Sequence, residues 1–279
     1  MKKQGYADQT ISSRISLIKT MLNRGADLDN PESVKETIAS QEWCEGRKRN
    51  AVHTYSSYLK MNGKTWEPPN YKLIPKIPWI PHEKLVDQLI AGCPNKYKPF
   101  LQLIKETGMR PGESWKLEWE HFDYISKNVR ITPEKGGNPR VLPISNNLIA
   151  ILKMLPKTTK FVFQNGRFRN FSEGFRRHRK RISASLGNPD LAQITFKTFR
   201  HFKGTMEYQL TKDLLHVKYV LGHKNIKNTL VYTHLIDFKE EEYVSKIAKD
   251  AEEACNLVES GFEFVCSTPD EFMIFRKRK

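Results

Sequence analysis

The sequence predicts a mainly α-helical protein with a small antiparallel β-sheet, an α+β fold, arranged in two domains. Apolar residues recur at helical spacing along most of the 279 residues, and two short β-prone segments flank a Gly-Gly pair. Five prolines fall among the sixteen residues 66–81 and exclude a helix or a central strand there. A chain of this length suggests one large domain or two modest ones, and the proline-rich stretch favours two.

Residues 1–65 are expected to form a helical domain. Apolar residues recur at helix spacing from residue 11, and "NPESVKETIAS" begins a second helix, with Asn30 as N-cap and Pro31 at its first position. "RKRNAVHTYSSYLKMNGK" predicts a third helix that ends at its glycine. Residues 66–80 then form an extended linker; the alternative is a long loop within a single domain.

Residues 81–237 are expected to form the second domain. Helical spacing resumes at "HEKLVDQLIAGC" and "YKPFLQLIKETG". "KNVRITP" and "RVLPI" predict a β-hairpin around "EKGGN", because a Gly-Gly pair suits a tight turn. Helices are expected to return from about residue 147 to the end of the 250s.

The segment 238–279 is expected to contain a helix and a short β-hairpin. "KEEEYVSKIAKDAEEACNLVESG" predicts a helix with an acidic outer face. Its predicted apolar stripe consists of Val244, Ile247, Ala251, Ala254 and Val258. The final "GFEFVCSTPDEFMIFRKRK" predicts two short strands around a turn.

Charge and composition narrow the class of partner. A formal net charge of +16 favours a polyanion, most simply nucleic acid; the alternative is a basic protein without a specific partner. The four cysteines show no C-x-x-C spacing and fit neither a zinc site nor a disulfide scaffold, so reduced thiols in an intracellular protein are expected. No membrane partner is expected, because no run of about 18 apolar residues occurs and "MKKQGYADQT" is not a secretory signal.

The stretch "ETGMRPGES" predicts a corner between two helices. Gly108 ends one helix and Pro111 suits the first position of the next, so Arg110 lies beside free backbone N–H groups. A guanidinium at such a corner attracts a phosphate. The alternative is that Arg110 pairs with Glu113 or Glu106.

Two further stretches place cations where they could meet an anion. "EKGGNPR" puts Lys135 at the tip of the hairpin, within reach of a groove; the alternative is a solvated turn lysine. In "TFKTFRHFKGT", Lys197 and Arg200 are three residues apart and share a helix face, with phenylalanines on the other side. The alternative there is a basic surface helix.

The stretch "LGHKNIKNTLVYTHL" adds a histidine and a tyrosine. Gly222 ends a helix, His223 lies in the following turn, and Tyr232 comes nine residues after it. Taken alone, either side chain would be read as a packing residue.

Together, these four stretches resemble the signature of the tyrosine recombinase (phage-type integrase) family. "TGMRPGE", "EKGGNPRVLPI", "KTFR" and "LGHKNIKNTLVYTH" occur in the family's order, over roughly residues 80–235. The resemblance implies a helical core-binding domain and a catalytic domain that close around DNA as a C-shaped clamp. The C-terminal ending also resembles integrases of archaeal mobile elements.

The resemblance implies a phosphate-binding site. Arg110 and Arg200 would hold the scissile phosphate, and His223 would hydrogen-bond to it. Glu113 matches the acidic residue of the first motif and would orient Arg110. Phosphoryl transfer depends largely on positioning and electrostatic stabilisation, which suits these residue types.

The resemblance also implies the reacting groups. Tyr232 would be the nucleophile and form a 3′-phosphotyrosine, and Lys135 would be the general acid for the leaving 5′-hydroxyl. Lys197 stands where many members carry histidine, which leaves its role in proton transfer open. The covalent intermediate conserves the bond energy, so no ATP is expected. The arginines, lysines and histidine would stabilise the negative charge themselves, so no metal or other cofactor is expected.

The resemblance further implies DNA as partner and a homo-oligomer on it. A dimer would bind one double-stranded attachment site, and a tetramer would form when two sites are paired in synapsis. The protein would belong to a prokaryotic or viral element and act in the cytoplasm, associated with the nucleoid. Segment 238–279 would dock on a neighbouring protomer; the alternative is that it folds back on its own domain. The predicted phosphate contacts are Arg47, Lys48, Arg49, Lys60, Arg176, Arg177, Arg179 and Lys180.

Two other functions remain open from the sequence. A type IB topoisomerase shares the same pocket and relaxes DNA as a monomer. A catalytically inert DNA-binding protein would keep the basic surface and make no covalent adduct. For the basic run "RFRNFSEGFRRHRKR", the alternative is a solvated helix face.

Overall fold

The computed structural model describes residues 1–279 except 75, 135, 165, 236–242, 269–271 and 279. The chain divides into two compact units, Met1–Lys76 and Ile77–Lys279, so the division falls within the predicted linker. In the parts of the chain that the structure describes, no helix is both long and apolar enough to cross a membrane.

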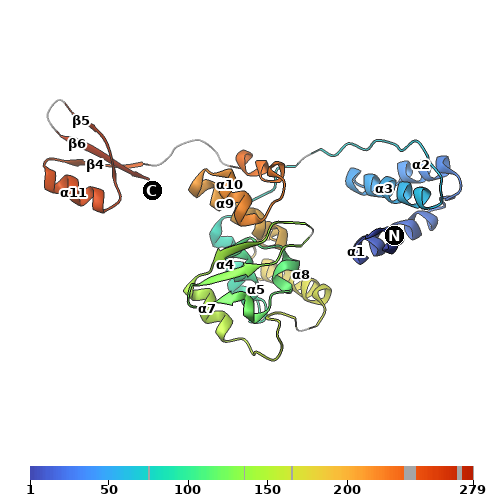
Figure 1. Ribbon diagram of the computed structural model, residues 1–279, viewed down its shortest axis with the longest axis horizontal. Coiled ribbons are helices and arrows are strands. Elements are labelled where there is room, and N and C mark those ends of the chain that lie inside the picture. The colour runs from blue at the N-terminus through green and yellow to red at the C-terminus, as the bar shows by residue number, and fades with distance from the viewer. Residues whose placement is uncertain (75, 135, 165, 236–242, 269–271, 279) are drawn as a thin grey trace. The chain divides into compact units, whose positions relative to one another are not determined.

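The N-terminal unit is helical, as predicted (Figure 1). It consists of a short 3₁₀ helix and three α-helices: Lys2–Gln4, α1 (Asp8–Leu22), α2 (Pro31–Ser40) and α3 (Glu45–Met61). The Asn30 side chain accepts hydrogen bonds from the backbone N–H groups of Glu32 and Ser33, which confirms it as N-cap of α2. Met21, Ile38 and Tyr55 lie in the core between the three helices.

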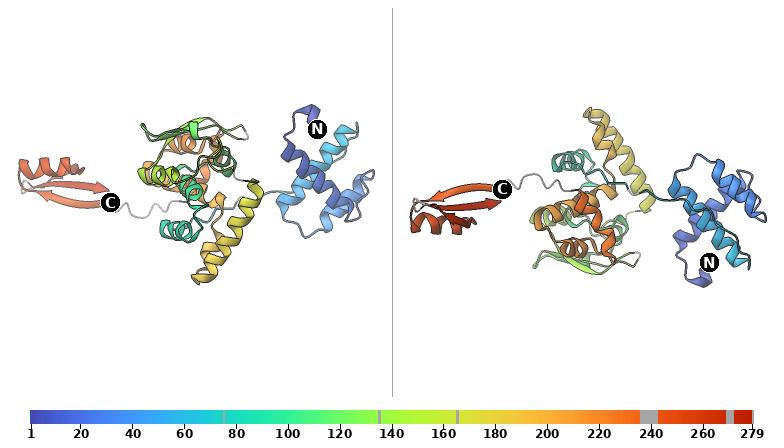
Figure 2. Two further views of the ribbon diagram at one scale, coloured as in Figure 1. Left: turned by 90° about the horizontal axis from the view of Figure 1, so that it is seen from below. Right: turned by 90° about the horizontal axis from the view of Figure 1, so that it is seen from above.

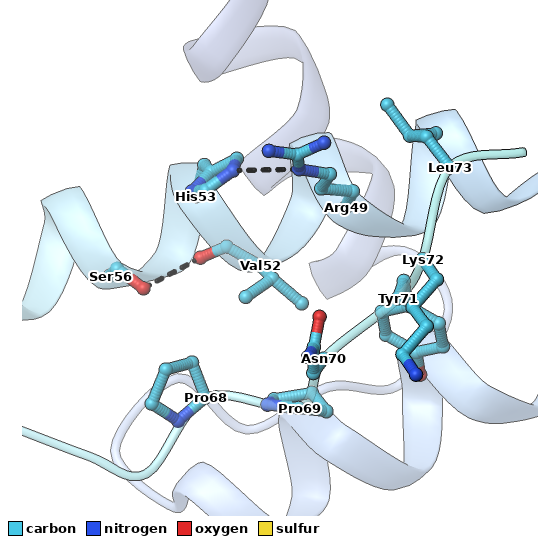
Figure 3. A pocket seen from close by; sticks show the side chains of 10 residues that line it. All are labelled: Arg49, Val52, His53, Ser56, Pro68, Pro69, Asn70, Tyr71, Lys72 and Leu73. Carbon is cyan, nitrogen blue, oxygen red and sulfur yellow. Dashed lines mark hydrogen bonds between the residues drawn. The ribbon is translucent and has the colours of Figure 1, made fainter. Parts of the chain in front are cut away.

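The first part of the proline-rich stretch packs on this unit. Trp66 Nε1 donates to Ser56 Oγ at 2.9 Å, and its ring meets Tyr55 edge-on at 4.7 Å between centroids. The Lys48 ammonium lies 5.6 Å from the centre of the Tyr71 ring. Residues 68–73 then form one wall of a groove whose other wall is the Arg49–Ser56 part of α3 (Figure 3).

The second unit contains the predicted helices and hairpin, with additions. Up to residue 235, its α-helices are α4 (Glu83–Gly92), α5 (Lys98–Thr107), α6 (Pro111–Trp115), α7 (Asn146–Lys153), α8 (Phe168–Ser185), α9 (Phe196–Thr211) and α10 (Leu214–Leu221). Its 3₁₀ helices are η2 (Trp119–His121), η3 (Pro189–Gln193), η4 (Ile226–Asn228) and η5 (Leu230–His234). Between about 147 and 235 the chain is therefore helical with irregular connections, and Tyr232 lies in a 3₁₀ helix.

The hairpin is part of a three-stranded antiparallel sheet. The strands are β1 (Phe122–Asp123), β2 (Asn128–Ile131) and β3 (Arg140–Pro143), in the order β1-β2-β3. Val129 pairs with both Phe122 and Leu142, and all three side chains are buried. Figure 2 shows this sheet on one side of the unit and the C-terminal half of α8 on the other.

Aromatic side chains fill the core between α5, α8 and α9. The Phe175 and Phe196 rings stack at 4.6 Å between centroids, and Phe100 meets Phe196 edge-on at 5.4 Å. Phe168 and Phe171 are partly buried against the same cluster. The predicted apolar face of the basic run is thereby confirmed, because its phenylalanines anchor α8.

The C-terminal segment differs from the predicted helix. Tyr243–Ala248 is a strand, β4, and the helix α11 spans only Ala251–Glu259; the predicted strands β5 (Glu263–Ser267) and β6 (Met273–Arg278) are confirmed. The sheet order is β4-β6-β5, with Ile247 opposite Ile274. The single-helix prediction was wrong, because pairing with a distant strand overrides a helical pattern at β4. Ala248, Phe262 and Phe275 form a small core against α11.

Candidate active site

Arg110 occupies the predicted corner between α5 and α6. Gly108 ends α5 with φ +61°, and Pro111 begins α6. The Arg110 backbone N–H donates to Glu113 Oε2 at 3.0 Å, and its guanidinium Nη1 donates to Glu113 Oε1 at 2.8 Å. The Arg110 side chain remains 25% exposed. Arg110 therefore pairs with Glu113, which was the alternative expected from the sequence, while part of its side chain remains exposed.

Glu113 also holds a second arginine that sequence reasoning missed. Both the Glu113 and Arg140 side chains are fully buried, and Arg140 Nη2 lies 2.8 Å from Glu113 Oε2. Arg140 Nε donates to the Val220 carbonyl at 2.8 Å, which ties β3 to α10. Burial raises the pKa of Glu113, but the hydrogen bonds and charges of Arg140 and Arg110 outweigh it and hold the pKa below its usual range. The available signal was an arginine opening the apolar strand "RVLPI".

Arg200 projects from α9 and joins the ends of two other helices. Its Nη1 donates to the Gly108 carbonyl at 2.7 Å and its Nη2 to the Leu221 carbonyl at 2.6 Å. Burial, followed by the charge of Arg110, lowers the pKa of Arg200 to about 10. The guanidinium therefore stays charged at neutral pH, and the two carbonyls fix its position.

His223 lies in the turn after α10, as predicted. It is 7% exposed, and its Nδ1 lies 3.0 Å from Thr229 Oγ1. Burial and then the charges of Arg200 and Arg110 lower the pKa of His223 to about 3. The imidazole is therefore neutral at physiological pH and suited to hydrogen bonding.

Tyr232 is buried against α9, close to Arg200. It is 1% exposed and packs against Val217 and Leu221. A Cβ on Gly204 would lie 2.6 Å from Tyr232 Cζ, so the ring rests directly on the backbone of α9. Burial raises the pKa of Tyr232 to about 12, against the lowering effect of Arg200. The hydroxyl is thus protonated in the free protein.

His201 is a neighbour of Tyr232 that sequence reasoning missed. Its Nδ1 lies 3.3 Å from the Tyr232 hydroxyl. Burial and then the charges of Lys197 and Arg200 lower the pKa of His201 to about 4. The signal was available in "KTFRH", because residues at i, i+3 and i+4 share one face of a helix.

Of the two lysines predicted for the site, Lys197 lies within the described residues and Lys135 does not. Lys197 is exposed and, with Trp79 and His201, lines a shallow pocket of about 210 Å³. Lys135 lies outside the described residues. The described part of its loop reaches the site, since Asn138 N–H donates to the Gly222 carbonyl at 3.3 Å.

The charges predicted to meet DNA are mostly exposed. Arg47, Arg49, Lys60, Arg176, Arg177 and Lys180 are exposed and Lys48 is partly exposed. Arg179 differs, because its Nη1 donates to the Ile194 carbonyl at 2.8 Å and its side chain is half-buried. Its guanidinium therefore holds α8 against the chain that precedes α9.

Metal-ligand chemistry and thiol pairing are not apparent in this site. Within the described ranges, no group of three or more His, Cys, Asp or Glu side chains could hold a metal ion. The cysteines are free thiols, and of the four only Cys93 is buried.

Comparison with known proteins assigns a family to this architecture. Residues 81–238 match the model of the phage integrase family. The tyrosine recombinase XerD of Vibrio vulnificus is 28% identical over 266 residues, covering 84% of this chain and 87% of the relative. The tyrosine recombinase XerA of Saccharolobus solfataricus is 24% identical over 239 residues, covering 84% and 77%.

Solved structures share the fold at low identity. The Tn1549 transposon integrase in complex with transposon right end DNA has a TM-score of 0.62 and 15% identity, covering 92% of this chain and 94% of that one. The XerH site-specific recombinase bound to difH has a TM-score of 0.55 and 19% identity, covering 74% and 67%. The matched range, residues 81–238, contains Arg110, Arg200, His223 and Tyr232. This chain belongs to the phage integrase family and is a site-specific tyrosine recombinase.

Proposed function

We propose that this recombinase cuts DNA by attack of Tyr232 on a phosphodiester and rejoins it through a Holliday junction, without metal or ATP. The observation that supports this proposal is that Arg110, Arg200, His223 and Tyr232 lie close enough for their charges to act on one another. The charge of Arg200 acts on both His223 and Tyr232, and the charge of Arg110 acts on Arg200 and His223. Three motifs far apart in sequence thus form one electrostatic unit.

The pocket suits an anion that gains charge during the reaction. Two guanidiniums and a neutral imidazole supply hydrogen-bond donors without a metal. Because Glu113 neutralises much of the charge of Arg110 and Arg140, the site can hold its cations close together before DNA arrives. Burial lowers the pKa of Arg200 and repulsion by Arg110 lowers it further, and the scissile phosphate would compensate that repulsion.

The covalent step conserves the energy of the bond that is cut. The Tyr232 oxygen attacks phosphorus, a 3′-phosphotyrosine forms, and the bond to the 5′-oxygen breaks. Lys135 gives a proton to that oxygen, in the role that the family resemblance implies for it. Attack by a 5′-hydroxyl of another strand reverses the step, so no external energy source is required.

The substrate is proposed to be a double-stranded attachment site of a mobile element, bound by a dimer and paired in a tetramer. The relatives support this, since XerH was solved on difH and the Tn1549 integrase on circular intermediate DNA. Proposed phosphate contacts are Arg47, Lys48, Arg49, Lys60, Arg176, Arg177 and Lys180. Arg179 is left out because it bonds the Ile194 carbonyl. A cytoplasmic, nucleoid-associated location follows from this substrate.

A covalent-capture experiment on duplexes of random sequence tests the proposal. Wild-type protein and Tyr232→Phe are incubated with nicked duplexes whose central region is randomised, and covalent adducts are recovered under denaturing conditions. We expect an adduct with the wild type, none with Tyr232→Phe, and a common sequence among the captured duplexes.

Three other outcomes would contradict the proposal. Adducts without a common sequence would indicate topoisomerase-like cleavage. Tight binding without an adduct would indicate an inert DNA-binding protein. An adduct that persists in Tyr232→Phe would exclude Tyr232 as nucleophile.

A further inference from the structure

The nucleophile of the proposed reaction needs a proton acceptor. The pKa of Tyr232 in the free protein is about 12, so almost none of it is phenolate at neutral pH. A nucleophile of this kind is activated by a neighbouring base within hydrogen-bond reach.

The cations of the pocket cannot take this proton. Arg110 and Arg200 have no lone pair to offer, and Lys197 as an ammonium has donors only. The Nδ1 of His223 faces Thr229 Oγ1 at 3.0 Å. Among the described residues, His201 is the one whose side chain lies within hydrogen-bond distance of the Tyr232 hydroxyl.

The contact between His201 and Tyr232 is fixed from both sides. His201 follows Arg200 on α9, and Arg200 is held by the Gly108 and Leu221 carbonyls. Tyr232 is held against the same helix, because the missing side chain of Gly204 leaves room for its ring. The imidazole and the phenol therefore meet on one face of α9, at 3.3 Å between Nδ1 and the hydroxyl oxygen.

We propose that His201 is a catalytic residue that accepts the Tyr232 hydroxyl proton at Nδ1 while the phenolic oxygen attacks phosphorus. The proton moves to the imidazole, the oxygen–phosphorus bond to Tyr232 forms, and the bond to the 5′-oxygen breaks. In the return step the imidazolium gives the proton back to the departing phenol. The inference rests on the proposed function.

DNA binding would switch this base on. In the free protein the charged neighbours of His201 are Lys197 and Arg200, with His223 and Tyr232 as the titratable groups facing it from the following segment. Burial lowers the pKa of His201 in the free protein, and the charges of Lys197 and Arg200 lower it further; a phosphate bound between these cations offsets their part and raises the pKa above about 4. His201 thus stays neutral and ready to accept before cleavage, and becomes a stronger base when the substrate is in place.

Single-turnover cleavage of the duplex most enriched by covalent capture tests the proposal. The variants are His201→Ala and His201→Asn, since asparagine can accept a hydrogen bond but cannot take up a proton. His234→Asn is the matched control, because His234 is exposed and two residues from Tyr232. We expect both His201 variants to cleave about 10²- to 10⁴-fold more slowly, with DNA affinity and melting temperature close to wild type.

The pH profile separates proton transfer from packing. In the wild type the cleavage rate should fall on the acid side as His201 becomes protonated. In His201→Asn this limb should be replaced by a tenfold rise in rate per pH unit, which follows the phenolate fraction of Tyr232.

A substrate with sulfur in place of the bridging 5′-oxygen adds a second test, because a thiolate leaves without a general acid. It should rescue Lys135→Ala and leave the His201 variants slow.

The possible results have distinct meanings. A wild-type rate and pH profile in His201→Asn would overturn the proposal and leave His201 as a hydrogen-bond partner only. Rescue of the His201 variants by the sulfur substrate would indicate that His201 acts on the leaving group, and this result would also overturn the proposal. If the wild type itself forms no adduct on any duplex, the proposed function fails before this question arises.

Discussion

At the scale of single residues, one buried carboxylate neutralises two arginine side chains. Glu113 lies between Arg110 and Arg140 with hydrogen bonds of 2.8 Å to each guanidinium. Such an arrangement holds two cations in a protein interior that would otherwise repel each other. Burial, and then the charges of neighbouring cations, lower the pKa values of His201 and His223 and keep both imidazoles neutral.

Replacing Glu113 by glutamine should destabilise the protein strongly. The change leaves the buried Arg140 guanidinium without a counter-charge, and breaking a buried pair in this way costs about 3 to 5 kcal/mol. Urea unfolding of Glu113→Gln against the wild type measures the loss. Glu173→Gln is the control, because Glu173 pairs with Arg169 at an exposed site. Equal stability of the two variants would show that Glu113 does not hold the arginines together.

Stability should fall in mild acid because of the same groups. Burial and cationic neighbours lower the folded-state pKa values of His201 and His223 to about 4 and 3, below an ordinary value of 6.5. Below pH 6.5 the unfolded chain therefore binds more protons than the folded one, and the free energy of unfolding decreases as pH falls towards 4. Glu113, whose pKa is also lowered, loses its contribution at still lower pH.

Urea unfolding at pH 7.5 and pH 5 measures this effect, and His223→Asn should reduce the difference between the two. An unchanged difference in that variant would indicate that the pKa of His223 is the same in the folded and unfolded states.

At the scale of secondary structure, the sequence predicted the features that depend on neighbouring residues, such as helix caps and turns. Asn30 and Pro31 mark the start of α2, and the Gly-Gly hairpin has the predicted strands, because caps and turns depend on neighbouring residues. β4 could not be predicted in this way, since its partner strand lies about thirty residues further along the chain. For the site, the four motif residues were predictable, whereas Arg140 and His201 act through contacts that only the folded chain creates.

Gly204 tests how closely α9 and the nucleophile must approach. Within a helix, alanine is favoured over glycine by about 1 kcal/mol, yet its Cβ would come within 2.6 Å of Tyr232 Cζ. We expect Gly204→Ala to lower both the melting temperature and the cleavage rate. The rate should fall at least about tenfold, because a small displacement of a reacting group slows a reaction strongly. In a Tyr232→Ala background the same change should lower the melting temperature less, because only the contact of the new Cβ with Leu221 Cδ1 at 2.9 Å remains.

Gly46→Ala is the matched control for stability, because its Cβ would meet Leu73 at an ordinary 3.6 Å. A Gly204→Ala variant that cleaves at the wild-type rate would show that Tyr232 reacts from another position.

At the scale of the whole molecule, a net charge of +16 should appear as a steep salt dependence of DNA binding. Arg176, Arg177 and Lys180 are exposed on α8. Replacing all three with glutamine should reduce the slope of log affinity against log salt by about 2.7, at about 0.9 per phosphate contact. Arg169→Gln, on the same helix, is the control and should leave the slope unchanged. A triple variant with the wild-type slope would place the DNA elsewhere.

The C-terminal segment is expected to serve assembly and not strand cleavage. Its strands and α11 enclose a core of their own around Phe262 and Phe275, so a chain ending at residue 237 keeps the hydrophobic core that surrounds Tyr232. We expect this truncated chain to form the covalent adduct on a single site at close to the wild-type rate. Pairing of two sites, measured by native gel or light scattering, and complete strand exchange should both be lost, because the segment is proposed to dock on a neighbouring protomer. Recombination at the wild-type rate would instead favour a segment that serves only its own protomer. Loss of the adduct would show that the segment completes the active site itself, and that would move Tyr232 activation from the single chain to the assembly.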